Sequence, residues 1–202
     1  MRGDENLQAN LETVRVAKEF LGNGVCALDL AGNEAAYPTE SFAEVFALAK
    51  DLEIPFIIHA GEAAGAESVW QAITLGAKRI GHGIRAIEDP ALVAFLKEKQ
   101  IPLEMCFTSN LQTKATADAE HYPLPAYLAE GLAVTVNTDN MTVSGTDLRR
   151  EYQLLGKTFG LSGERMQAIA CNAVEAAVLA PEQKAVLKNR IAEGFSDWFT
   201  NA

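Results

Sequence analysis

The chain has 202 residues, of which 49% are hydrophobic and 22% are charged, and its net charge is −10. This length and composition are typical of a folded chain with a sizeable core. The acidic balance argues against a nucleic-acid surface, which needs clustered Lys and Arg, and equally against an anionic membrane surface. No apolar run approaches the ~20 residues of a membrane span, and the polar first ten residues predict no signal peptide.

The first half of the chain alternates helices with short strands. Apolar residues at helical spacing predict helices over 7–21, 41–52 and 65–76. Apolar runs of strand length predict strands over 25–32, 55–62 and 79–84. Ser41 and Glu44 form a capping-box pattern at the start of the second helix.

The second half continues the alternation and then becomes helical. Asp89-Pro90 predicts a helix start, with proline at the first helical position. Strands are expected over 101–110 and 132–140, and the last sixty residues read as helices broken near Gly160 and Pro181. No linker or low-complexity segment interrupts the chain, so we expect a single domain over 1–202.

Polar residues occur where each predicted strand ends. They are Asp29, Gly32, His59, Glu62, His82, Ser109, Asn110, Asp139 and Asn140. A (β/α) barrel builds its active site in this way, at the carboxyl ends of its strands. A doubly wound sheet uses mainly one switch point, and no G-x-G-x-x-G follows a strand here. The pattern therefore predicts an α/β fold of the (β/α)8 TIM-barrel type.

The barrel is expected to be incomplete in this chain. A full barrel takes ~250 residues, whereas about five βα units followed by extra helices are visible in these 202 residues. We therefore expect a C-terminal part of a barrel whose N-terminal strands are absent. An open sheet edge of this kind favours association with another chain.

Four residues at the strand ends carry the chemistry of a hydrolytic metal site. Imidazole and carboxylate groups bind catalytic zinc, and a further His or Glu can act as acid or base. Each residue has a simpler explanation: a solvated pair for His59 and Glu62, a satisfied buried histidine for His82, and a helix N-cap for Asp139. Convergence on one rim favours the metal site. For His121, in a polar loop, the structural explanation is preferred.

The three cysteines, Cys26, Cys106 and Cys171, are far apart and odd in number. They show no metal-binding spacing and are interpreted as buried apolar thiols. We therefore expect a reducing compartment, the cytoplasm.

Four motifs in this order resemble the adenosine/AMP deaminase family: HAGE (59–62), RIGHGI (79–84), PLEMCFTSNLQT (102–113) and VNTDN (136–140). The segment LDLAGNE (28–34) is similar to that family's glycine-bearing strand end. The resemblance covers about residues 1–180. It implies a zinc-dependent purine deaminase on a (β/α) barrel, with adenosine converted to inosine and ammonia.

The resemblance also implies a role for each matching residue. His59 and Asp139 would bind Zn²⁺, and Asp139 would also accept a hydrogen bond from the attacking water. Glu62 would donate a proton to purine N1, and His82 would orient the water. The backbone of Gly32 would contact purine N3.

Two departures from the family pattern qualify these roles. The family has a second Asp at the position of Asn140, where it contacts purine N7. An amide can donate to N7 directly, so the contact can be kept while substrate preference is open. The family also has a His-x-His pair that supplies two more zinc ligands, whereas this chain has three histidines and no such pair.

Several functions remain open at this point. The chain could be part of an active deaminase, a catalytically silent remnant or interaction module, or one of two polypeptides that complete the site together. A small-molecule purine is the expected partner. Adenosine is preferred to adenine or a related aminopurine, and AMP is disfavoured because only Arg85 adds a cation near the strand ends.

Overall fold

The structure, a computed structural model, describes residues 2–3 and 6–200. It divides into two compact units, Met1–Leu103 and Glu104–Ala202. Five strands follow one another in the order β1-β2-β3-β4-β5, and helices separate them along the chain. The predicted α/β fold is confirmed, and the single domain over 1–202 stays a prediction.

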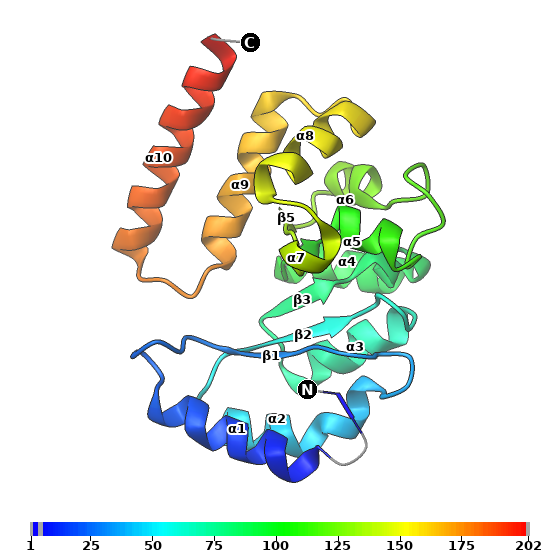
Figure 1. The fold of residues 1–202 in the computed structure, drawn as a ribbon, viewed down its shortest axis with the longest axis vertical. Helices are drawn as coiled ribbons and strands as arrows, with labels where there is room; N and C mark the ends of the chain where they lie inside the picture. The colour runs from blue at the N-terminus through cyan, green and yellow to red at the C-terminus, as the bar shows by residue number, and fades with distance from the viewer. Residues whose placement is uncertain (1, 4–5, 201–202) are drawn as a thin grey trace. The chain divides into compact units, whose positions relative to one another are not determined.

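The first unit is a parallel sheet with helices between its strands (Figure 1). Its elements are α1 (Leu7–Glu19), β1 (Leu28–Leu30), η1 (Thr39–Phe42), α2 (Ala43–Asp51), β2 (Phe56–Ala60), α3 (Ala66–Leu75), β3 (Arg79–His82), η2 (Ile84–Glu88) and α4 (Pro90–Lys99). The register aligns Leu30 with Ile58 and Ile58 with Ile80. These three side chains are buried, so one apolar row crosses the sheet and fixes which residues reach the strand ends.

Two helix starts in this unit test the predicted caps. Asp89 caps α4, and its carboxylate accepts a hydrogen bond from the Ala91 amide at 2.9 Å; this prediction is confirmed. The capping box at Ser41 and Glu44 is wrong, because a 3₁₀ turn over Thr39–Phe42 precedes α2 and no side chain caps it. The local sequence fits a capping box, but the chain enters α2 through a 3₁₀ turn, which is tighter than an α-helical turn.

The second unit starts inside β4, which runs from Leu103 to Met105. It continues with α5 (Phe107–Gln112), α6 (Leu124–Glu130), β5 (Val134–Val136), α7 (Met141–Ser144), α8 (Leu148–Phe159), α9 (Gly163–Ala176) and α10 (Pro181–Thr200). The predicted strand over 101–110 is therefore too long: its second half is helix α5. The Asn137 amide donates to the Met105 carbonyl at 2.9 Å, which joins the ends of β4 and β5.

The helical end of the chain breaks at the predicted residues. Gly160, with φ of +62°, ends α8, and Pro181 opens α10, as expected for glycine after a helix and proline at its start. Within the described residues, no helix is long and apolar enough to cross a membrane. The three cysteines form no disulfide; Cys106 is buried as predicted, whereas Cys171 is only partly buried and Cys26 is exposed.

Candidate active site

His59 lies near the end of β2, against a carboxylate and a glycine on the flanking strands. Its Nε2 is 3.1 Å from Oδ2 of Asp29 on β1. On the other side it aligns with Gly81 of β3. A Cβ atom on Gly81 would lie 2.2 Å from Cδ2 of the His59 ring, so only glycine leaves room for the imidazole. The Asp29 contact orients the ring, as carboxylates do for metal-binding histidines.

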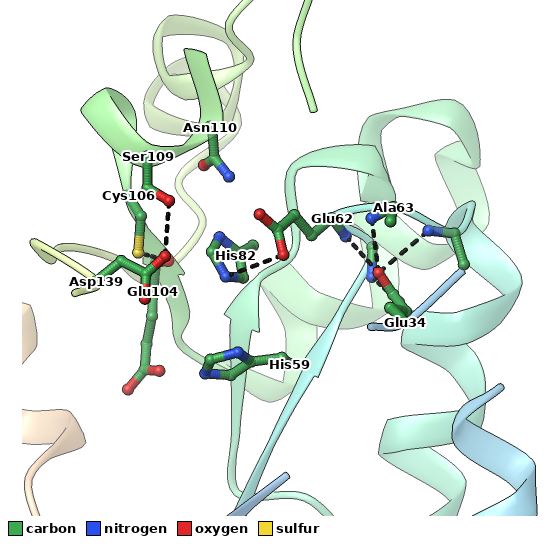
Figure 2. A network of polar contacts seen from close by, with 12 residues as sticks. Glu34, His59, Glu62, Ala63, His82, Glu104, Cys106, Ser109, Asn110 and Asp139 are labelled. Carbon is green, nitrogen blue, oxygen red and sulfur yellow. Dashed lines mark hydrogen bonds and ion pairs between the residues drawn. The ribbon is translucent and has the colours of Figure 1, made fainter. Parts of the chain in front are cut away.

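His82 and Glu62 form a second pair in the same unit (Figure 2). Nε2 of His82 is 3.5 Å from Oε2 of Glu62, and the His82 side chain is only 2% exposed. The rings of His59 and His82 meet edge to face, with centroids 5.0 Å apart. The structure thus brings together three of the predicted residues, at the ends of β2 and β3.

The backbone at His82 is strained, with φ of +60°. Among the described residues, four other non-glycine residues have positive φ, and one of them is Asp139. Such a conformation costs about 1–3 kcal/mol and is concentrated at functional sites. The simpler explanation of His82 as a packed core histidine accounts for its burial, but not for its strained backbone beside a carboxylate.

The loop after β2 is held by Glu34, a residue to which the sequence assigned no role. Its buried carboxylate accepts hydrogen bonds from the amides of Gly61, Glu62, Ala63 and Ala64. Figure 2 shows these bonds converging on the Glu34 carboxylate. Asp29 was likewise marked only as a polar strand end. Both contacts join segments about thirty residues apart, which sequence spacing does not reveal.

Gly32, the predicted purine contact, lies just after β1 with φ of +118°. A Cβ at this position would lie 3.3 Å from Cβ of Arg2. The backbone angle favours glycine, and a Cβ would also press closely against Arg2. The structure thus explains the glycine, and the purine contact itself stays a prediction.

Asp139 and Asn140 belong to the second unit and follow β5. Asp139 accepts a hydrogen bond from the Ser109 hydroxyl at 2.6 Å, and this contact is drawn in Figure 2. The helix cap considered for Asp139 is made by Asn140 instead, whose Oδ1 accepts from the Val143 amide at 3.0 Å. Asp139 is thus not used as a cap, and its carboxylate is oriented by a buried serine.

A fully buried carboxylate, Glu151, organises the neighbourhood of Ser109 in this unit. It accepts hydrogen bonds from the Thr108 amide at 3.1 Å, from the Thr108 hydroxyl, and from the Thr146 hydroxyl at 2.6 Å. Thr108 lies in the first turn of α5, directly before Ser109. Glu151 therefore ties α5 to the segment that follows α7.

Replacing Glu151 with glutamine should destabilise the fold. The amide keeps one acceptor oxygen and turns its NH2 group toward the donors, which leaves a buried group unsatisfied at a cost of about 1–3 kcal/mol. Urea unfolding followed by circular dichroism measures the change, with the exposed Glu164→Gln as the matched control. Equal midpoints for the two variants would contradict this role.

His121, for which the structural explanation was preferred, lies on the surface. Its Nδ1 is 2.7 Å from Oδ1 of Asp118. The hydrogen bond and the charge of Asp118 raise the pKa of His121 above its usual value. The pair closes a local turn and is explained without a ligand.

His121→Ala should leave zinc content and turnover unchanged, because the side chain is exposed and its partner is three residues away. Metal analysis and a rate assay on the same preparation test this. A large loss of either would place His121 in the site.

The donor types in the chain fit zinc, but the described residues do not form a complete site. His59 and Asp139 offer the imidazole and carboxylate groups that zinc accepts. Across residues 2–3 and 6–200, however, no three His, Cys, Asp or Glu side chains cluster as metal ligands. A catalytic zinc usually has three protein ligands and a water.

The fold and the strand-end residues define a class: an α/β protein that carries imidazole and carboxylate groups at the ends of parallel strands, as (β/α)-barrel enzymes do. The family profile described as adenosine deaminase matches residues 1–194. The chain therefore belongs to the adenosine deaminase family of hydrolases, as its motifs predicted.

Curated relatives are similar over nearly the whole chain. The adenosine deaminase of Haemophilus ducreyi is 47% identical over 198 residues, covering 96% of this chain and 58% of the relative. That of Enterococcus faecalis is 43% identical over 195 residues, with the same coverage. The chain thus spans somewhat more than half the length of these relatives.

Solved structures agree with the fold. An adenine deaminase from Arthrobacter aurescens superposes with a TM-score of 0.88 at 28% identity, over 96% of this chain and 59% of that one. An Arabidopsis ADAL in complex with IMP gives a TM-score of 0.83 at 28% identity, over 96% and 56%. The five-stranded α/β fold of this chain therefore matches part of the barrel in solved structures of the family.

Proposed function

We propose that this chain is part of a zinc-dependent enzyme that hydrolyses adenosine to inosine and ammonia. The observation that carries the proposal is the group formed by His59, Glu62 and His82 at the ends of β2 and β3. Asp29 contacts the His59 ring, and Gly81 leaves room for it. Family membership and relatives named adenosine deaminase at 43–47% identity support the substrate.

In this proposal each residue has a distinct role. Glu62 gives a proton to purine N1, which makes C6 more electrophilic. His82, beside Glu62, orients the attacking water, and Asp139 accepts a hydrogen bond from it. The Gly32 backbone contacts N3, and the amide nitrogen of Asn140 donates to N7 while its oxygen caps α7.

His59 and Asp139 are proposed as zinc ligands. A bound zinc would act as a Lewis acid. It would lower the pKa of its bound water toward ~7 and so provide a nucleophile at neutral pH. The remaining ligands would come from outside this sequence, because the two other histidines are His82, paired with Glu62, and His121, paired with Asp118. A polypeptide that completes the barrel would supply them, and an open sheet edge would favour its association.

A cytoplasmic enzyme acting on a small purine fits the remaining features. The three cysteines form no disulfide, and the net charge of −10 disfavours nucleic acid and anionic membranes as partners. Adenine is the second candidate substrate, favoured by the structural similarity to an adenine deaminase.

Zinc content and adenosine turnover of the 202-residue chain, followed by the ultraviolet change from adenosine to inosine, test the proposal. The same assay with adenine separates the two substrates. If the isolated chain has neither zinc nor turnover, and a segment bearing a His-x-His pair restores both, the result supports a shared site. No activity in the completed protein would favour a catalytically silent interaction module.

Asp139→Ala should weaken zinc binding at least about tenfold in the completed protein, because even residues that merely orient zinc ligands change affinity by ~10–100-fold. Ser109→Ala, which removes only the hydrogen bond to Asp139, is the milder companion variant. Full metal occupancy in Asp139→Ala would remove this residue from the ligand set.

A further inference from the structure

Glu34 is a buried carboxylate that the proposed chemistry does not use. It follows β1, in the segment LDLAGNE, and its side chain lies against the loop that carries Glu62. We propose that Glu34 is a positioning residue: it shapes the loop Gly61–Ala64 and thereby holds the Glu62 carboxyl group beside His82. The inference rests on the proposed function only in the role that it assigns to Glu62.

The geometry is that of an anion surrounded by donors. One Glu34 oxygen accepts from the Gly61 amide at 2.7 Å and from the Ser68 hydroxyl at 2.6 Å. The other accepts from three successive amides, those of Glu62 at 3.0 Å, Ala63 at 2.7 Å and Ala64 at 3.1 Å. An ionised carboxylate only accepts and offers about four lone-pair sites, so these five donors fill its capacity and some of them share a site.

The surroundings favour the ionised form. Burial alone would raise the pKa of Glu34, but the hydrogen bonds from Ser68 and from the amides of Ala63, Ala64 and Gly61 outweigh it and leave the pKa below its usual value. Arg2, which is also buried, adds an attractive charge and donates to the His59 carbonyl at 2.6 Å. The loop therefore forms around a fixed negative charge.

The loop conformation decides where the Glu62 side chain points. Gly61 turns the chain with φ of +72°, and a Cβ there would lie 2.6 Å from Cγ2 of Val69. The turn is followed at once by Glu62, whose carboxylate lies 3.5 Å from Nε2 of His82. Arg85 also restrains Glu62, because its Nε donates to the Glu62 carbonyl at 3.1 Å. A neutral Glu34 would carry an O–H donor and accept fewer hydrogen bonds, and without Glu34 all four amides would lose their shared acceptor. In either case the loop can relax.

Histidine NMR reads the position of Glu62 without zinc or substrate. The chain has three histidines, so each ring signal is assigned by one substitution. Glu62→Gln gives the reference signal for a His82 that has lost its carboxylate partner. In Glu34→Gln, we expect the His82 signal to move toward this reference while the His121 signal stays. The exposed Glu40→Gln is the matched control and should move neither.

Amide hydrogen exchange gives the second measurement. In Glu34→Gln, exchange at Gly61–Ala64 should accelerate by about tenfold or more, the effect of losing roughly one net hydrogen bond. The amides of α4 should be unaffected. Unchanged loop exchange, or faster exchange with an unmoved His82 signal, would overturn the proposal, since Glu34 would then be purely structural. If Glu34→Gln does not fold, Ser68→Ala removes one of the five donors and should shift His82 slightly in the same direction; no shift overturns the proposal.

Turnover of the completed enzyme separates this inference from the proposed function. Glu34→Gln should lower kcat with little change in KM, because a misplaced proton donor affects the chemical step rather than binding. An unaltered protein without turnover would count against the proposed function alone. The NMR and exchange results would still decide the role of Glu34.

Discussion

Glu62→Gln should abolish most of the deaminase turnover of the completed protein while leaving its fold intact. The amide cannot donate the acidic proton proposed for purine N1, and general acid catalysis contributes about 10²–10⁴-fold. Glutamine has nearly the same shape, and the Glu62 side chain is 20% exposed. The substitution should therefore change the free energy of unfolding only slightly. The rate is measured by the ultraviolet change from adenosine to inosine, and zinc content on the same sample.

The control for this variant is Glu98→Gln, which changes an exposed carboxylate on α4. It should keep the normal rate. Near-normal turnover in Glu62→Gln would remove the proton-donor role. Loss of both zinc and turnover would instead show that Glu62 supports the metal site and that its effect on the rate is indirect.

The local features of the fold were predictable because they depend on short stretches of sequence. Alternating apolar runs and helical spacing predicted the elements of the first unit, and Asp89-Pro90, Gly160 and Pro181 fixed helix ends through their own backbone chemistry. The error at 101–110 has a clear origin. Its apolar letters fit a strand, but Glu151 from a later helix accepts hydrogen bonds at the start of α5 and stabilises a helical turn there.

The site divides in the same way. His59, Glu62, His82 and Asp139 were predicted because they interrupt apolar strands at the carboxyl ends, where barrels hold their chemistry. The groups that orient them, Asp29, Glu34 and Ser109, act through contacts across about thirty residues. Their partners cannot be deduced from spacing, and a carboxylate such as Glu34 resembles any surface acid until its burial is known.

Gly81→Ala should displace His59 and destabilise the first unit. The added Cβ would lie 2.2 Å from Cδ2, 2.8 Å from Cγ and 3.0 Å from the backbone Cα of His59. The ring can rotate away, but the Cα belongs to the paired strand β2, so the two strands must also move apart. Overpacking of this kind costs about 1–3 kcal/mol. Urea unfolding measures the loss, and the His59 ring signal reports the displacement.

Gly194→Ala is the matched control, because a Cβ there has no atom within 4 Å and the residue lies in helix α10. Alanine should leave the unfolding midpoint unchanged or raise it slightly, since it favours helix over glycine by about 0.5–1 kcal/mol. A Gly81→Ala protein that unfolds like the unaltered chain and keeps its His59 signal would show that β2 and β3 can absorb a methyl group. If the displacement occurs, zinc binding in the completed protein should fall with it, because His59 would no longer meet the orienting carboxylate of Asp29.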